Sequence, residues 1–147
     1  MRDWERTFIE RHRVARLATV DGQGHPHSVP IIYAFDGQRL FTPIDAKPKR
    51  VGPHQLGRVR NIRTNPHIAV VVDEYSEDWR ELAWVQIHGV ATLVESGPEY
   101  EAGVALLEAK YPQYATMPLA GRPMIVVKVN RVSSWRARSL PEALRRD

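Results

Sequence analysis

The segment Leu40–Arg50, which reads LFTPIDAKPKR, places three cations after a predicted buried strand: Lys47, Lys49 and Arg50. Cationic side chains at a strand end, together with free backbone N–H groups, can hold a phosphate by charge-assisted hydrogen bonds worth roughly 1.5 to 3 kcal/mol each. Two interpretations are open from the residues alone. The segment is either a phosphate-binding loop or a solvated loop whose cations pair with Asp45 or with water.

The other residue types narrow the chemistry mainly by exclusion. The chain has no cysteine, which excludes disulfides, thiolate nucleophiles and cysteine-ligated metals. It has no GxSxG, HExxH or GxxxxGK[ST] motif, and the GQG at 22–24 falls in a predicted hairpin. His25 and His27 stand two apart without a clear third ligand, so they are interpreted as solvent-facing and no metal site is predicted. No nucleophile or acid–base pair is recognisable, which favours binding or cofactor-borne chemistry.

Charge is unevenly distributed along a chain whose net charge is +4. From 46 to 72 there is no acid but six cations, whereas the next segment, 73–81, carries five acids. The basic block could bind nucleic acid, but it lacks the aromatic residues that single-strand binders interleave with their cations. We therefore do not expect nucleic acid to be a partner.

Length and composition predict one ordinary globular domain spanning 1–147. At 147 residues with 43% hydrophobic and 26% charged residues, the chain can bury a single core. No run of about 18 apolar residues occurs, and the charged N-terminus does not resemble a signal peptide. We expect a cytoplasmic protein without a membrane span.

Hydrophobic periodicity predicts six strands and three short helices. The strands are expected at 14–20, 25–35, 38–44, 67–75, 82–95 and 123–137, and the helices at 3–13, 55–66 and 97–112. Asp3 is a candidate N-cap, and Asp21–Gly24 and Asp36–Gly37 are hairpin signals. Gly89 interrupts the longest strand and suggests a bulge or a close backbone approach. The expected fold is a mainly β, closed or nearly closed antiparallel barrel over about 14–136, followed by a C-terminal tail at 137–147.

Several motifs occur in order along most of this frame. They are R-L-A-T, D-x-K-x-K-R, N-P before a strand, and D-x-Y-x-x-D-W-x-x-L-x-W-V. From about Val14 to Trp135 the chain resembles the pyridoxamine 5′-phosphate oxidase-like superfamily, whose fold is the six-stranded, FMN-binding type of split β-barrel. More narrowly, it is similar to the flavin/deazaflavin oxidoreductases of the B branch, many of which use coenzyme F420.

The resemblance implies a homodimer with two cofactor sites at the subunit interface. Lys47, Lys49 and Arg50 would hold the cofactor phosphate, and Thr42 and Pro43 would lie beside the ring or ribityl chain. The backbone of Ser28, Val29, Pro30 and Ile31 would line the tricyclic ring. Trp79 and Trp84 would reach the site from the partner subunit, with core packing as the alternative for each tryptophan.

At one position that bears on the choice of cofactor, this chain departs from the family pattern. Members that use the deazaflavin often carry Arg where this chain has Gln86, and Gln cannot offer a charged fork. The activity implied is hydride transfer from reduced F420 to a conjugated organic substrate such as a quinone or tetrapyrrole, with positioning and electrostatics supplied by the protein.

Other functions remain open at this point. The same barrel could bind FMN and act as an oxidoreductase. Oxidation of pyridoxamine phosphate itself is not expected, because the segment SSWRAR resembles the C-terminal, substrate-binding arginine motif of that enzyme only weakly. The chain could also be a non-catalytic cofactor or haem carrier. The candidate axial ligands for haem are His12, His25, His27, His54, His67 and His88.

Overall fold

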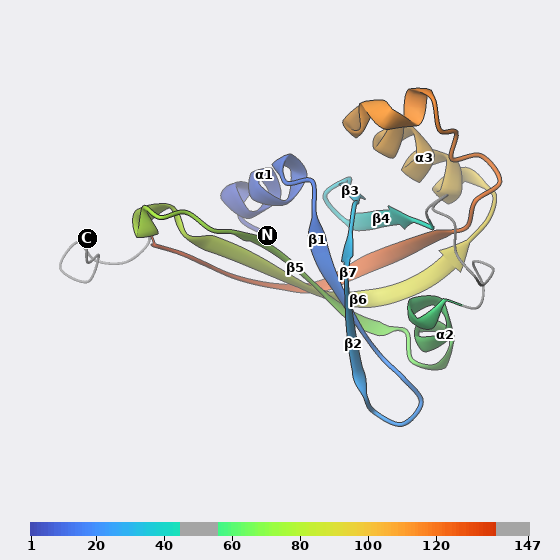
Figure 1. Cartoon of the computed structure of the whole chain (residues 1–147), viewed down its shortest axis with the longest axis horizontal. Helices are drawn as coiled ribbons and strands as arrows, with labels where there is room; N and C mark the ends of the chain where they lie inside the picture. The colour runs from blue at the N-terminus through green and yellow to red at the C-terminus, as the bar shows by residue number, and fades with distance from the viewer. Residues whose placement is uncertain (45–55, 138–147) are drawn as a thin grey trace.

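The computed structural model describes residues 1–44 and 56–137 (Figure 1). Its elements are α1 (Asp3–Arg11), β1 (Ala15–Val20), β2 (Pro26–Ile31), β3 (Ala34–Phe35), β4 (Arg39–Pro43), α2 (Gly57–Thr64), β5 (His67–Glu74), η2 (Trp79–Glu81), β6 (Ala83–Val94), α3 (Pro98–Lys110), η3 (Pro112–Ala115) and β7 (Met124–Arg136). None of the described helices is both long and apolar enough to cross a membrane. The predicted tail lies outside the described residues except for Ala137, whose N–H donates to the Leu82 carbonyl.

The strands form one curled antiparallel sheet with the order β2-β1-β5-β6-β7-β4-β3. The expected antiparallel split barrel is confirmed, but the sheet has 7 strands rather than six. The predicted strand 25–35 is divided because β2 pairs with β1 at one edge of the sheet, whereas β3 pairs with β4 at the other. The chain crosses between these two edges at Ile32 and Tyr33, which curls the sheet into a half-barrel.

Tyr111 satisfies the backbone where this crossing interrupts the ladders. The Tyr33 N–H donates to the Tyr111 hydroxyl at 3.1 Å, and that hydroxyl lies 2.9 Å from the Tyr33 carbonyl oxygen and 2.7 Å from the Arg13 carbonyl oxygen. Its single proton is therefore shared between two acceptors. A buried backbone group without a partner would cost about 1 to 3 kcal/mol, so the side chain of the residue that caps α3 stabilises the bend.

Lys110 lies beside the same bend. Its Nζ donates to the His12 carbonyl at 2.5 Å and sits 4.0 Å from the centre of the Tyr33 ring. Burial lowers the pKa of Lys110 to about 8, and the nearby charge of Arg13 acts in the same direction while Glu10 opposes it. The end of α3, the end of α1 and the bend therefore meet around a partly desolvated ammonium group.

Two hydrophobic clusters occupy opposite faces of the sheet. The larger lies inside the curl and receives Phe8 and Ile9 from α1 and Val59 and Ile62 from α2. The smaller lies on the outer face under α3, where Phe41 of β4 packs with the tyrosines and leucines of α3 and η3. The described helices thus cover the inner face and one end of the outer face (Figure 1).

Gly89 marks the point where β7 changes its register against β6. His88 pairs with Arg131 and Gly89 pairs with Val129, so Asn130 has no partner on β6. A Cβ on Gly89 would lie 2.3 Å from the Lys128 carbonyl oxygen. The close backbone approach expected at Gly89 is confirmed, and the extra residue of the bulge belongs to β7.

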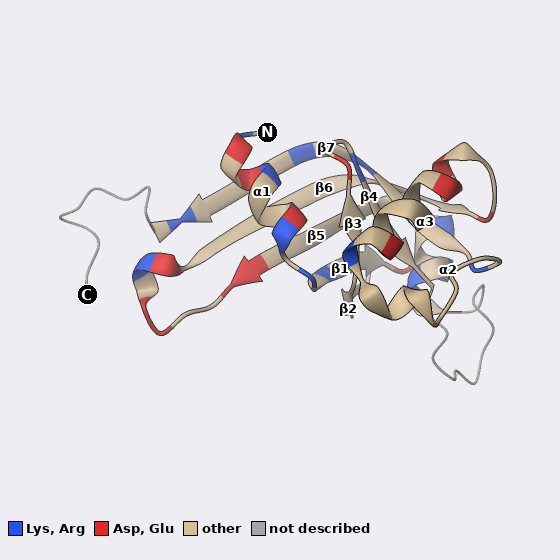
Figure 2. Ribbon diagram, turned by 90° about the horizontal axis from the view of Figure 1, so that it is seen from above, with Lys and Arg blue, Asp and Glu red and all other residues tan. Residues whose placement is uncertain are grey.

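Beyond this bulge, β5, β6 and β7 continue past the other strands as a three-stranded extension. β1 pairs with β5 only at 69–71, and the pairing of β4 with β7 ends at Lys128. We call residues 72–88 and 129–136 the arm; they form the long projection at the left of Figure 1. The acids of 73–81 lie along β5 and η2 at this end of the molecule (Figure 2).

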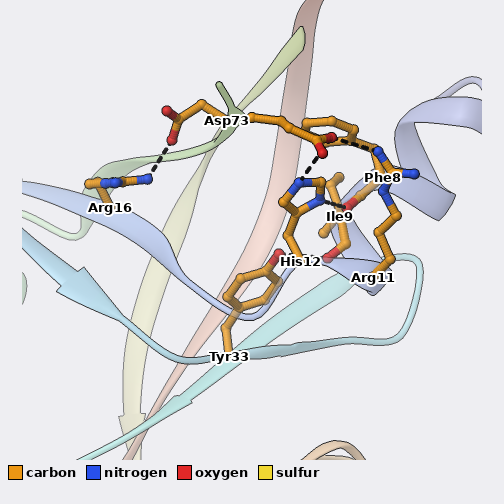
Figure 3. Close-up of polar contacts among 8 residues, drawn as sticks. Phe8, Ile9, Arg11, His12, Arg16, Tyr33 and Asp73 are labelled. Atoms are coloured by element: carbon orange, nitrogen blue, oxygen red, sulfur yellow. Dashed lines mark hydrogen bonds and ion pairs between the residues drawn. The ribbon is translucent and has the colours of Figure 1, made fainter. Parts of the chain in front are cut away.

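Helix α1 is fixed to the arm through its C-terminal turn. Arg11 donates to the Glu74 carboxylate at 2.7 Å, and the Nε2 atom of His12 lies 3.5 Å from the same carboxylate. The Tyr33 hydroxyl donates to the Ile9 carbonyl at 2.6 Å, as Figure 3 shows. At the other end of α1, Arg2 rather than Asp3 is the N-cap, and its N–H donates to Glu5.

Candidate functional site

Among the residues that the structure describes, nothing covers the outer face of the sheet beyond α3 and η3. Its outward side chains fall into rows set by the strand register, and none of them is buried. We call these residues the open face: Ser28, Ala18, Ala69, His88 and Arg131 in one row; Pro30, Arg16, Val71, Gln86 and Ser133 in the next; and Asp73, Trp84 and Trp135 on the arm.

The middle of the open face is lined with small and apolar side chains. Ala18, Ala69 and Val71 are half-buried, and they lie next to one another across β1 and β5. Trp84 and Trp135 face each other across β6 and β7 at one side of this surface. Such a surface, apolar with an aromatic border, can accept a planar ring system.

Charged groups surround this apolar centre. Arg16 forms an ion pair with Asp73 across β1 and β5 (Figure 3). On the other side, a guanidinium nitrogen of Arg131 lies 3.4 Å from the Nδ1 atom of His88. This contact favours the tautomer in which Nδ1 accepts and Nε2 carries the proton. The face therefore offers Arg, His, Ser and Gln donors around a surface where a ring could lie.

The predicted site residues do not all share this face. Ser28, Pro30, Trp84 and Gln86 belong to it, as the rows above describe. Val29 and Ile31 alternate to the inner side, where Ile31 is part of the core and Val29 packs against it. A contact with either residue from the open face would have to be made through its backbone.

The remaining predicted residues lie near the ends of their elements. Thr42 and Pro43 are buried in β4, just before the undescribed segment, and Lys47, Lys49 and Arg50 lie outside the described residues. Trp79 is 61% exposed in η2, and Trp84 is 38% exposed on the arm. The alternative of core packing is therefore wrong for both tryptophans.

Several members of the open face were not singled out from the sequence as site residues. Arg16, Arg131, Ser133 and Trp135 each alternate with inward-facing residues along a strand, which indicates the sheet face they occupy. Alternation alone does not indicate which strands are neighbours. The sequence did not show that β6 pairs with β7 or that a bulge changes the register of this pair, and both facts are needed to group these residues.

The histidines considered as haem ligands are dispersed. His12 is tied to the Phe8 carbonyl and to Glu74, whereas His88 lies on the open face. His25 contacts Asp21, and the ring of His27 lies against the N-terminus of α2 at Gly57. His67 is exposed on β5, and His54 lies outside the described residues. Among residues 1–44 and 56–137, no three His, Asp or Glu side chains lie close enough together to hold a metal ion.

Among known proteins, this chain is similar in sequence to an enzyme whose name states the reaction it catalyses. A 5a,11a-dehydrotetracycline/5a,11a-dehydrooxytetracycline reductase from Streptomyces rimosus is 32% identical over 97 residues. The matched region covers 63% of this chain and 63% of that relative's own length.

Solved structures with the same fold include proteins of different described roles. A conserved hypothetical protein from Mycobacterium tuberculosis superposes with a TM-score of 0.69 at 25% identity, covering 97% of this chain and 90% of that chain. HutZ, the haem storage protein of Vibrio cholerae, gives 0.68 at 18% identity, with 89% and 90% covered. A FAD-binding protein from Mesorhizobium loti gives 0.65 at 19% identity, with 91% and 94% covered. The last two likenesses show the fold alone.

A family model covers nearly all of the described chain. The family model described as pyridoxamine 5′-phosphate oxidase matches residues 1–136, from just before α1 to the end of β7. Together with the split-barrel sheet, this match shows that the chain belongs to the pyridoxamine 5′-phosphate oxidase family.

Proposed function

We propose that this protein is an oxidoreductase that uses coenzyme F420 to reduce a conjugated organic substrate, with FMN as the alternative cofactor. The observation that carries the proposal is the open face itself. Ser28 and Pro30 of β2 and Trp84 and Gln86 of β6 come from two distant segments of the chain and lie on the same part of the outer face, which no described helix covers.

The family and the reductase relative support the reaction class. The relative's name gives it a polycyclic, conjugated substrate, which suits an apolar surface bordered by tryptophans. Quinones and tetrapyrroles are further candidates of the same chemical kind. Because the chain belongs to this family, a flavin-type cofactor is supported, but the family match does not distinguish F420 from FMN.

When bound, the reduced cofactor supplies the hydride. The chain's own residues would bind and orient both partners. Ala18, Ala69 and Val71 offer an apolar floor for the ring, and Gln86 and Ser133 offer neutral hydrogen-bonding groups at the neighbouring positions of β6 and β7. Lys47, Lys49 and Arg50 would hold the phosphate by charge-assisted hydrogen bonds.

We also propose that two copies of the chain form the complete site. Tyr75, Trp79 and Trp84 are exposed at 68%, 61% and 38%, and all three belong to the arm. Exposed aromatic residues grouped on a projecting element are typical of a surface that packs against a partner. A homodimer would bring the arm of one copy to the open face of the other and would exclude water from the reacting ring.

The test is a binding titration of apo-protein with oxidised F420 and with FMN, followed by ligand fluorescence. We expect micromolar affinity for F420 and weaker binding of FMN. The double variant Lys49→Ala, Arg50→Ala should bind at least tenfold more weakly, which corresponds to about 1.4 kcal/mol. Arg122→Ala removes a cation from the loop before β7 and serves as the control.

Each outcome separates the alternatives. Preference for FMN would move the protein to flavin-dependent chemistry on the same face. Binding of neither cofactor would refute the proposed function, and unchanged affinity in the double variant would remove these two cations from the phosphate site. Light scattering tests the dimer, which should have twice the chain mass of 16.8 kDa.

A further inference from the structure

A cavity lies on the opposite side of the arm from the open face. It has a volume of about 340 Å³ and separates α1 from the arm at the start of β6 and the end of β7. Its walls include Trp4, Thr7 and Phe8 of α1, Leu82 and Ala83, and Arg136. Pockets for small molecules commonly have volumes of roughly 300 to 1,000 Å³ and mostly apolar walls with a few polar groups. We call this space the α1–arm cavity.

One wall of the α1–arm cavity is aromatic. The rings of Trp4 and Phe8 lie one helical turn apart on α1, with centroids 6.1 Å apart in an edge-to-face arrangement. Leu82 and Ala83 contribute aliphatic surface from the arm. A flat ring could therefore lie against aromatic and aliphatic groups.

The second feature is a hydrogen-bond donor that has no acceptor. The Nε1 atom of Trp4 is enclosed and has no hydrogen-bond partner among the described residues. A buried donor without an acceptor costs about 1 to 3 kcal/mol, and such groups in folded proteins call for an explanation. The Trp4 ring lines the cavity, but its Nε1 atom is shielded from solvent, so an oxygen atom of a molecule bound there would supply the missing acceptor after a small shift of the side chains that cover this atom.

The charges around the cavity favour an anionic oxygen. Arg11, Arg80 and Arg136 line it, against the two carboxylates of Asp3 and Glu81. The guanidinium carbon of Arg136 lies 4.5 Å from the centre of the Trp4 ring, and that of Arg11 lies 5.4 Å from the centre of Phe8. Arg11 is already ion-paired with Glu74 at 2.7 Å, so Arg136, over the Trp4 ring, is the cation best placed to attract a negatively charged group.

We propose that the α1–arm cavity is a second small-molecule site, which binds a planar aromatic or conjugated carboxylate or phenolate. Its ring packs against Trp4 and Phe8, and its anionic oxygen accepts from the Trp4 indole N–H beside Arg136. This site is on the other side of the arm from the open face, so it does not depend on the proposed redox function.

The direct test follows the Trp4 indole N–H by ¹⁵N–¹H NMR while 2-naphthoate is added to the full chain. The four tryptophan side-chain signals are assigned with single Trp→Phe variants. We expect a saturable downfield shift of the Trp4 signal. The cationic analogue 2-naphthylmethylammonium should bind at least tenfold more weakly.

Two variants make the test specific. Trp4→Phe keeps an aromatic ring but removes the donor, and should weaken 2-naphthoate binding at least fivefold with a native amide spectrum. Thr7→Tyr fills the cavity from an exposed position of α1, so it should abolish binding without disturbing the fold. Trp79→Phe, outside the cavity, is the matched control and should bind normally.

The proposal is overturned if the Trp4 signal does not move at millimolar 2-naphthoate or if the cationic analogue binds equally well. It is equally overturned if both Trp4→Phe and Thr7→Tyr leave the affinity unchanged. Because no F420 or FMN is present in this experiment, its outcome is independent of the cofactor titration.

Discussion

The outer face of the sheet has two halves that share the strands β6 and β7 but differ in what covers them. In the covered half, Met124 and Val126 of β7 are buried with Phe41 under α3. In the open half, Arg131, Ser133 and Trp135 of the same strand face outward without a covering helix in the described structure. One strand therefore supplies both a packed core and an accessible surface.

The difference shows how the fold separates stability from binding. The covered half is filled by aromatic and aliphatic groups, whose burial contributes to the free energy of folding. The open half keeps small apolar residues and polar donors partly exposed, although covering them would stabilise the fold further. Accessibility of this kind is expected where a surface is reserved for a ligand or a partner.

The strongest test of this contrast exchanges one aromatic residue in each half for alanine. Phe41→Ala removes a fully buried ring and should lower the free energy of unfolding by about 3 to 5 kcal/mol. Trp84→Ala should change it by only about 0.5 kcal/mol, because surface substitutions rarely exceed that value. Urea denaturation of both variants measures the difference; equal losses would show that the open half is also a structural core.

The boundary between the two halves can be tested at Gly89. Gly89→Ala would place a Cβ within 2.3 Å of the Lys128 carbonyl oxygen and should cost about 1 to 3 kcal/mol of stability through overpacking. Gly22→Ala is the control, since its nearest contact would be an ordinary 3.6 Å. Thermal or urea unfolding compares the two, and a neutral Gly89→Ala would show that the β6–β7 register can shift at low cost.

The chemical role of the open half is tested by adding a charge. Gln86→Arg introduces a cationic fork beside Val71 and Ser133 and should tighten F420 binding by about threefold to tenfold, or up to about 1.4 kcal/mol. Thr92→Arg adds the same charge to an exposed position of β6 on the side of the bulge away from the arm, and it should have no effect. Equal affinities for Gln86→Arg and the unaltered chain would mean that this position does not contact the cofactor.

The smallest expected effect concerns the packed side, through the pH dependence of stability. The pKa of Lys110 is lowered to about 8 in the folded protein, so the unfolded chain binds the proton more tightly. Stability should therefore rise as pH increases from about 8 toward the unfolded pKa of about 10.4. The gain should be about 1 kcal/mol relative to Lys110→Met, less than the pKa shift alone would give because Lys110 is partly exposed.

Urea titrations at pH 7 and pH 9.5 measure this gain, with Lys128→Met as the exposed-lysine control. The upper limit avoids the tyrosines, because burial raises the pKa of both Tyr33 and Tyr111 and their ionisation would act in the opposite direction above pH 10. A pH dependence identical in Lys110→Met would indicate that this ammonium is fully solvated in the native state.

Much of the fold could be predicted from local patterns in the sequence. Alternation of apolar residues predicted the strands, the Asp–Gly pair at 36–37 predicted a hairpin, and Pro98 predicted the start of α3. These features depend on backbone preferences that a few neighbouring residues determine. The division of 25–35 into β2 and β3 was not predictable in this way, since it depends on pairing with two distant strands and on the Tyr111 hydroxyl.

For the candidate site, the sequence determined the chemical types and the tertiary structure determined their grouping. The residue types and motifs indicated Ser28, Pro30, Trp84 and Gln86 as candidates, but their common face follows from the register of β2, β1, β5 and β6. The α1–arm cavity was likewise not predictable, because Trp4 and Arg136 are far apart in the chain and meet only when α1 packs against the end of β7. A sequence determines which groups a chain carries; long-range strand pairing and helix packing decide which of them become neighbours.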